Sequence, residues 1–205
     1  IVEGGKDMGN RIYPIGIQNF EKIRKEGYVY VDKTALMYKL VKSGSYFFLS
    51  RPRRFGKSLL ISTLEAYFEA KRDLFEGLAV ETLEKDWVKR PVFHLDLNIG
   101  KYDTPDSLDK ILNETLDYWE SLYGTRSAET TLALRFAGVV GRAYEQSGER
   151  VAILIDEYDK PLLQAIGNEE LQREFRNTLK PFYGVLKTMD GCIKFALLTG
   201  VTKFG

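Results

Sequence analysis

An unbroken apolar run that ends in two acids constrains the fold more than any other segment. Val151 to Ile155 contains only apolar residues, and Asp156 and Glu157 follow it at once. A strand that is hydrophobic on both faces is typical of a parallel sheet covered by helices on both sides. Polar residues at the carboxyl end of such a strand lie at the edge where open α/β sheets bind ligands. The segment therefore predicts an α/β fold with these two acids near a functional site.

Other parts of the chain supply the rest of such a sheet. Short apolar runs predict three further strands, at Tyr46–Leu49, Val92–Leu97 and Ile193–Leu198. Apolar residues at helical spacing predict helices at Lys57–Ala70, Pro105–Tyr123, Ala128–Gln146, Pro161–Ile166 and Glu169–Thr188. The elements alternate along the chain as a layered α/β domain requires.

The N-terminal part predicts a preamble to this core. Asn19 is expected to cap a short helix, Tyr28–Val31 to form a short strand, and Asp32 to cap a second helix. We therefore expect residues 1–44 to form an N-terminal extension packed on a core of residues 45–205.

The composition argues against several classes of protein. The chain has 30 basic and 29 acidic residues and a formal net charge of +1, which does not indicate a strongly basic nucleic-acid binder. Cys192 is the only cysteine and His94 the only histidine, which excludes an internal disulfide and the common zinc spacings. No apolar run is long enough to cross a membrane. We expect a cytoplasmic protein with no membrane partner.

A glycine, a lysine and a serine directly after the first core strand predict a phosphate-binding loop. Gly56, Lys57 and Ser58 open the predicted helix, where backbone N–H groups converge on an anion, the lysine reaches the outer phosphates and the hydroxyl binds Mg²⁺. Arg51 stands where this motif normally has glycine, so the start of the loop either bends differently or carries strain. The alternative is an ordinary surface turn.

The acids after the buried strand have separable expected roles. Asp156 would support Mg²⁺ through its water shell, and Glu157 would orient and deprotonate the water that attacks the γ-phosphate. The alternative is a pair of strand-end acids that cap the following helix. Asp159 is the residue that we expect to form that cap.

The order of the motifs along the chain predicts the type of sheet. One additional strand, Val92–Leu97, lies between the loop of Lys57 and the acid Asp156. P-loop proteins with a catalytic glutamate insert such a strand, which predicts a P-loop NTPase three-layer sandwich with the parallel order 5-1-4-3-2. Val92–Leu97 then lies at the sheet edge, as its half-polar alternation suggests. The last strand ends at Thr199, whose hydroxyl would face the γ-phosphate as a sensor or bond to its own turn.

Five segments resemble the AAA-ATPase-like family of predicted prokaryotic ATPases. They are Tyr13–Gln18, Tyr30–Thr34, Arg51–Ser58, Leu154–Asp159 and Leu198–Thr202. An arginine-rich loop usually replaces the leading glycine in that family, which implies that Arg51 is ordinary in this position. Members often continue into a nuclease-like domain of the PD-(D/E)XK type. Neither that domain nor a fifth strand or helical lid is recognised here, so we expect an N-terminal fragment, truncated at its C-terminus.

The resemblance also implies roles for the motif residues. Lys57 and Ser58 would carry phosphate and Mg²⁺, Asp156 and Glu157 would form the Walker B pair, and Thr199 would be the sensor. The full set of expected nucleotide contacts in the loop is Arg53, Arg54, Phe55, Gly56, Lys57, Ser58 and Leu59.

Two arginines of the loop and the lone histidine have other interpretations. Arg53 and Arg54 would grip phosphate, contact nucleic acid or an acidic partner, or lie in a solvated loop. His94 is expected to be a structural, hydrogen-bonded residue of an edge strand.

These features together predict an ATPase that uses ATP and Mg²⁺. Hydrolysis would drive or gate an attached effector, which by resemblance is nuclease-like and acts on nucleic acid. The alternative is a nucleotide-gated interaction switch that turns ATP over slowly or not at all. Besides ATP, the expected partners are a second copy of the chain or an effector domain of the full-length protein.

Overall fold

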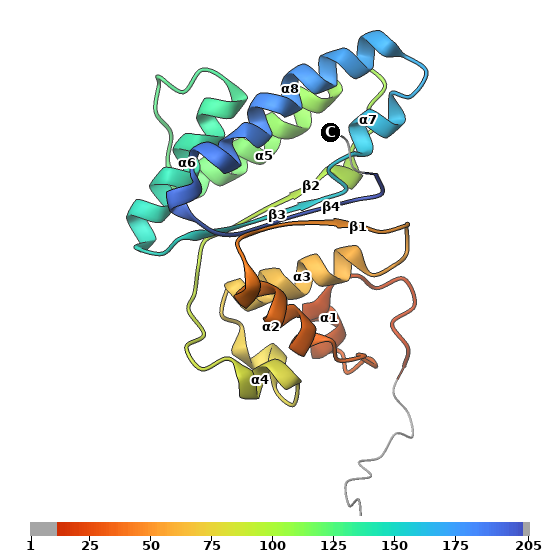
Figure 1. Cartoon of the computed structure of the whole chain (residues 1–205), viewed down its shortest axis with the longest axis vertical. Coiled ribbons are helices and arrows are strands. Elements are labelled where there is room, and N and C mark those ends of the chain that lie inside the picture. The colour runs from red at the N-terminus through yellow and green to blue at the C-terminus, as the bar shows by residue number, and fades with distance from the viewer. Residues whose placement is uncertain (1–11, 203–205) are drawn as a thin grey trace, which may run out of the picture.

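A parallel sheet of four strands forms the centre of the molecule (Figure 1). The structure is a computed structural model that describes residues 12–202. The strands are β1 (Tyr46–Ser50), β2 (Val92–Asp96), β3 (Val151–Asp156) and β4 (Ile193–Gly200). They lie in the order β1-β4-β3-β2, and all neighbours are parallel. The predicted parallel α/β fold is confirmed, and β2 lies at an edge of the described sheet. The five-strand order stays a prediction.

Helices cover both faces of this sheet and make three layers (Figure 1). On one side lie α1 (Phe20–Lys25), α2 (Thr34–Ser43), α3 (Lys57–Phe68) and α4 (Ala79–Leu83). On the other lie α5 (Ser107–Tyr123), α6 (Leu132–Ser147), α7 (Lys160–Gln164) and α8 (Glu169–Thr188). Short 3₁₀ turns follow α3, β2 and α8 at Arg72–Phe75, Leu97–Ile99 and Asp190–Cys192.

The central position of β3 follows from its composition. Every residue of this strand is buried. Ile153 and Ile155 pack in the apolar cluster beneath α5, α6 and α8, whereas Ala152 and Leu154 pack in the cluster on the α3 side. A strand whose successive side chains are apolar on both faces needs helices on both faces, and the two helical layers supply them.

Two helices begin later than the sequence predicts, and for one of them a side-chain cap explains the start. The helix expected from Pro105 begins at Ser107, and the one expected from Ala128 begins at Leu132. The Thr131 side chain accepts a hydrogen bond of 3.2 Å from the Leu134 N–H and so fixes the start of α6. The predicted α8 has the observed bounds.

The predicted strand at Tyr28–Val31 is wrong. This segment is an irregular connection between α1 and α2, and its Val29 N–H donates to the Ile12 carbonyl instead of entering the sheet. Its aromatic character serves packing: the ring of Tyr30 lies edge-on to Phe20, 5.1 Å between centroids. β-branched and aromatic content predicted the wrong element because a half-buried loop uses the same residues.

The segment before β1 shares a core with α3. Phe20 is fully buried and packs on Phe75 with ring centroids 4.9 Å apart. The Arg24 guanidinium donates to the Leu74 carbonyl at 2.7 Å, which ties α1 to the turn after α3. The division into residues 1–44 and 45–205 stays a prediction, and its parts at 1–11 and 203–205 lie outside the described residues.

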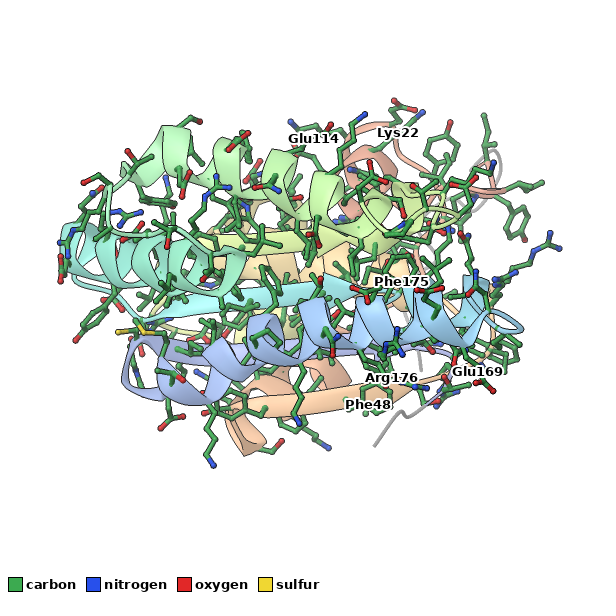
Figure 2. All side chains as sticks on the ribbon, turned by 90° about the horizontal axis from the view of Figure 1, so that it is seen from above. Lys22, Phe48, Glu114, Glu169, Phe175 and Arg176 are labelled. Carbon is green, nitrogen blue, oxygen red and sulfur yellow. The ribbon has the colours of Figure 1, made fainter. Side chains whose placement is uncertain are left out.

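The outer helices are amphipathic, as their apolar spacing predicted. Figure 2 looks onto the layer of α5 and α8, where Glu169 and Arg176 lie at the surface. Phe175 of the same helix is buried in the cluster over the sheet. Within residues 12–202, no helix has the length and apolar character needed to span a membrane.

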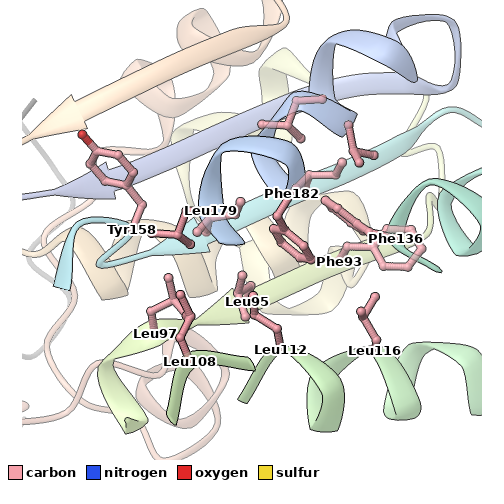
Figure 3. Packing of buried hydrophobic residues seen from close by; sticks show 14 of the residues in the cluster. Phe93, Leu95, Leu97, Leu108, Leu112, Leu116, Phe136, Tyr158, Leu179 and Phe182 are labelled. Atoms are coloured by element: carbon pink, nitrogen blue, oxygen red, sulfur yellow. The ribbon is translucent and has the colours of Figure 1, made fainter. Parts of the chain in front are cut away.

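Three aromatic rings stack in the layer of α5, α6 and α8, and Figure 3 labels two of them, Phe136 and Phe182. Phe136 of α6 lies 4.6 Å from Phe182 of α8, with an angle of 12° between the ring planes, and 5.5 Å from Trp119 of α5. One side chain therefore joins all three long helices of this layer, and it is fully buried.

We expect Phe136→Ala to lower the free energy of unfolding by about 3–5 kcal/mol, because it leaves a cavity between three helices. Urea denaturation followed by circular dichroism measures this loss. Tyr118→Ala removes a ring that is 63% exposed on α5 and should cost far less. Equal losses in the two variants would contradict the assigned packing.

Candidate functional site

A polar cleft lies where the carboxyl ends of the parallel strands meet. Its volume is about 190 Å³, and it is lined by Gln18, Arg53, Arg54, Gly56, Lys57, Ser58, Leu59, Asn98 and Glu157. Gln18 comes from the segment before α1, and the others come from the loop after β1, the start of α3, and the chain just after β2 and β3. Open α/β sheets bind ligands at this edge.

The loop after β1 is anchored to the end of β4. The Ser50 hydroxyl donates to the Val201 carbonyl at 2.8 Å, and the Arg51 N–H donates to the Gly200 carbonyl at 3.1 Å. The left-handed backbone that the usual motif has at the position of Arg51 occurs instead at Arg54 (φ 67°) and Gly56 (φ 77°), so the loop bends differently. The loop therefore bends later than the usual motif, and Arg54 carries the conformation that glycine adopts without strain.

Lys57 is the first residue of α3 and is buried, 4% exposed. Its ammonium donates to the carbonyl of Arg51 at 2.9 Å and lies 3.1 Å from Glu157 Oε1. An ammonium inside the protein needs such partners because desolvation of an unpaired charge is costly. The cleft is thus crossed by one ion pair between the loop and the end of β3.

Glu157 owes its position to an unusual backbone angle. Its φ is 53°, which non-glycine residues rarely adopt. Its N–H points back to the sheet, where Asp156 Oδ1 accepts at 3.1 Å and Thr199 Oγ1 at 3.3 Å. Its carboxylate lines the cleft. Strained residues of this kind cluster at functional sites.

Asp156 and Thr199 form a buried pair behind that glutamate. The Thr199 hydroxyl donates to Asp156 Oδ1 and does not bond its own turn. Both residues are buried, at 3% and 0% exposure. Neither lines the cleft, so the structure separates them from the loop residues that do.

Asp159 is the N-cap residue of α7, as predicted, but the predicted cap by its side chain is wrong. Its side chain makes no hydrogen bond to the start of α7. Asp159 Oδ2 instead accepts from the Val201 N–H at 2.8 Å and the Thr202 N–H at 2.6 Å. A Cβ on Gly200 would lie 2.7 Å from Asp159 Oδ1, so only glycine fits this close approach. The acid fastens the end of β4 to the chain after β3.

Two lining residues were not singled out by the sequence analysis. Asn98 follows β2 at the same sheet edge, and the Lys160 ammonium donates to its side-chain oxygen at 2.8 Å. Its place after a predicted strand was the available signal. Gln18 belongs to one of the segments that carried the family resemblance, but no local chemistry pointed to it.

The other loop residues predicted to contact nucleotide do not all line the polar cleft. Arg53, Arg54 and Leu59 line the polar cleft. Phe55, 63% exposed, lines a neighbouring apolar pocket.

His94 lies elsewhere, on β2, with Nδ1 at 3.1 Å from Glu65 Oε2. Burial lowers the pKa of His94, but the hydrogen bond and charge of Glu65 outweigh it, so the pKa is raised overall. This is the hydrogen-bonded edge-strand arrangement that the sequence analysis expected of this residue.

Comparison with known proteins assigns the chain to a family. The sequence model of the AAA-ATPase-like family, described as "Predicted AAA-ATPase", matches residues 14–205. The chain belongs to the AAA-ATPase-like family. A protein of Azotobacter chroococcum mcd 1, named "Uncharacterized protein in vnfD 5′region", is 40% identical over 199 residues, which is 96% of this chain and 38% of that protein. No solved structure matches the chain significantly.

Asp159→Ala tests whether this acid fastens the end of β4 to the chain after β3. We expect the free energy of unfolding to fall by at least about 2 kcal/mol, because two backbone N–H groups lose their acceptor. Thermal and urea unfolding measure it. Asp106→Ala, an exposed aspartate before α5, is the control and should change stability little. A loss no larger than that of the control would contradict the anchoring role.

Proposed function

We propose that this domain binds ATP with Mg²⁺ and hydrolyses it. The observation that carries the proposal is the buried Lys57 ammonium at the start of α3, facing Glu157 across a cationic cleft. Membership in a family described as predicted AAA-ATPases supports ATP as the nucleotide.

The cleft suits a triphosphate chemically. Arg53, Arg54 and Lys57 line it, and each supplies positive charge and hydrogen-bond donors. Gly56 precedes the first turn of α3, whose N–H groups have no intrahelical partner and favour an anion. A polyphosphate would satisfy these groups together.

The protein side chains alone are too few to bind Mg²⁺ here, so phosphate oxygens would have to supply further ligands. No group of three His, Cys, Asp or Glu side chains in the described part of the chain could hold a metal ion. Mg²⁺ commonly takes one or two protein ligands plus phosphate oxygens and water. We assign Ser58 as its direct ligand and Asp156 as support through water; the ion would neutralise charge on the phosphates.

We assign catalysis to Lys57, Glu157 and Thr199. Lys57 would hold the outer phosphate, and Glu157 would accept a proton from the attacking water. Thr199, as the expected sensor, would act through its bond to Asp156, because its hydroxyl faces that carboxylate. For the fold, we propose a P-loop domain of the additional-strand type whose sheet has the order 5-1-4-3-2. We propose that residues 45–205 form its core.

A slowly hydrolysing switch is the second candidate. The ion pair between Lys57 and Glu157 favours it, since the base must leave the lysine before it can act. For the whole protein we propose that nucleotide state drives or gates an attached effector or self-association. Contact of Arg53 or Arg54 with nucleic acid belongs to the same proposal.

Lys57→Ala should weaken Mg·ATP binding by at least about tenfold, because one charge-assisted phosphate contact is worth roughly 1.5–3 kcal/mol. Isothermal calorimetry measures the dissociation constants. Lys110→Ala, at an exposed lysine of α5, should bind as the wild type does. Unchanged affinity in a folded Lys57→Ala protein would remove the phosphate-loop assignment.

Glu157→Gln should keep ATP affinity or raise it, and should lose hydrolysis. The amide cannot accept the proton, yet it releases Lys57 from an ion pair that competes with phosphate. Single-turnover assays at saturating Mg·ATP measure the rate, with Glu169→Gln on the outer end of α8 as control. Hydrolysis by Glu157→Gln at the wild-type rate would rule out this base. A wild type that binds but does not hydrolyse ATP would favour the switch.

A further inference from the structure

A separate hollow follows the free edge of β2. Its volume is about 650 Å³, and residues of α3, β2 and α5 line it. Figure 1 shows α3 and α5 on opposite faces of the sheet, so one hollow can touch both only by passing around the sheet edge. None of its lining residues lines the polar cleft. We call this hollow the β2 groove.

The edge of β2 that borders the groove offers backbone groups for pairing. The Ala152 N–H of β3 donates to the Pro91 carbonyl at 2.9 Å, so Pro91 turns its backbone toward β3. Backbone groups of successive residues in a strand point to opposite sides. The N–H and C=O groups of Val92 and His94 therefore point into the groove, and no strand in the described part of the chain pairs with them.

This edge is recessed between the two helical layers. Val92 and His94 are half-buried, whereas Tyr118 and Leu122 on the α5 wall are 63% and 54% exposed. A second copy of β2 would bring its own α3 and α5, which would meet these walls before the two edges came within the about 4.8 Å that strand pairing needs. A single extended segment has no helices beside it and can enter. The recess therefore favours such a segment over a second copy.

The two walls differ in chemistry. The α5 wall presents the side chains of Tyr118, Leu122 and Tyr123. The α3 wall presents the carboxylates of Glu65 and Glu69, each with 34% of the side chain exposed. Successive side chains of an added strand point to opposite faces of the sheet. A segment that alternates apolar and basic residues would therefore complement both walls.

The carboxylates of the α3 wall can accept further hydrogen bonds. Glu65 Oε2 lies 3.1 Å from His94 Nδ1, and Glu69 Oε2 lies 2.9 Å from the Lys71 ammonium. An ionised carboxylate has two oxygens with about four acceptor positions. Each acid can thus bind a cation of the segment through Oε1 without losing its present partner.

The amino end of β2 carries the opposite charge. Lys89 lines the groove there and is exposed. Its neighbour Arg90 is already bound to Glu149, at 2.7 Å. A segment antiparallel to β2 ends beside Lys89, where an acidic residue or a carboxyl terminus would be attracted. The charges of the groove therefore favour one direction of the segment.

We propose that the β2 groove binds an extended segment of a partner protein as a strand antiparallel to β2. Basic residues of the segment face α3, the apolar residues between them face α5, and an acidic end lies beside Lys89. In binding by strand addition, main-chain hydrogen bonds supply affinity and the side-chain walls supply specificity. The proposal goes beyond nucleotide binding, and its tests need no nucleotide.

Fluorescence anisotropy with labelled, end-blocked peptides tests the charge pattern. The probe has three lysine–valine repeats followed by glutamate. A control peptide has glutamate at every lysine position and lysine at the end. We expect the probe to bind at least about tenfold more tightly, because each charged contact adds to the affinity. Equal binding of the two peptides would overturn the proposed partner chemistry.

Backbone methylation of the probe tests strand pairing. In an antiparallel pair, residues that exchange hydrogen bonds have their side chains on the same face. The lysines of the probe therefore pair with Val92 and His94, whose side chains face the α3 layer. N-methylation of the lysine residues should weaken binding at least about tenfold, whereas N-methylation of the valines should change it little. Tight binding of the lysine-methylated probe would overturn strand addition, and loss with the valine-methylated probe alone would overturn the antiparallel direction.

Matched variants test the two walls with the same probe. Leu122→Gln should weaken binding about threefold or more through lost apolar burial, whereas Leu134→Gln, at a 50% exposed leucine of α6, should not. Glu69→Gln should weaken binding to a similar extent, with Glu114→Gln on the exposed face of α5 as its control. Circular dichroism checks that each variant is folded. Equal effects of a variant and its control would contradict the assigned wall.

Amide hydrogen exchange followed by NMR locates the added strand. The N–H groups of Val92 and His94 should exchange at least about tenfold more slowly when the probe is bound, because they gain hydrogen-bond acceptors. Unchanged exchange at both would overturn the proposal. Sedimentation velocity of the free protein tests the other occupant: a dimer that Leu122→Gln dissociates would show that a second copy fills the groove, and would also overturn it.

Discussion

The complete burial of β3 is the constraint on which the other features depend. Because both faces of this strand are apolar, it requires a helical layer on each side and a neighbour along each edge. The acid that ends it cannot stay unpaired in such surroundings. Asp156 finds the Thr199 hydroxyl on β4, and Asp159 finds two N–H groups just beyond that strand. The ends of β3 and β4 are thereby locked to each other.

The contacts between the ends of β3 and β4 extend through β1 to the loop that follows it. The backbone and hydroxyl contacts of Ser50 and Arg51 reach Gly200 and Val201, so the loop starts from the same fixed point. Side chains that hold a ligand must be placed within fractions of an ångström, and sites on rigid elements achieve this better than sites on free loops. The arginine-rich loop can dispense with a leading glycine because its bend lies at Arg54 and Gly56.

The sequence predicted the helices and strands that are marked by regular spacing of apolar residues. It did not predict features that depend on contacts between residues distant along the chain. β3, α8 and the strand order of the described sheet follow from apolar spacing and from motif order along the chain. The strand predicted at Tyr28–Val31 is wrong because the ring of Tyr30 packs against Phe20, and the segment does not pair with another strand. The side-chain contacts of Asp159 were not predicted because its partners lie more than 40 positions along the chain, where no local sequence pattern indicates them.

The candidate site divides in the same way. Gly56, Lys57, Ser58 and Glu157 come together as motif spacing predicted, although their roles remain proposals. Gln18 and Asn98 join them only through the fold. So does the apolar pocket, whose walls are assembled from segments before and after β1.

Under the proposed function, the ion pair between Lys57 and Glu157 would link phosphate binding to catalysis by competition. The ammonium already has a carboxylate at 3.1 Å, so a phosphate that takes its place must displace that carboxylate. In such an exchange the lysine keeps an anionic partner throughout, so its buried charge is never left unpaired. It would also leave Glu157 beside the phosphates, still held by its own backbone bonds to Asp156 and Thr199. In the proposed reaction, phosphate binding and release of the base would then be one event, and the strained φ of Glu157 would keep the freed carboxylate directed at the cleft.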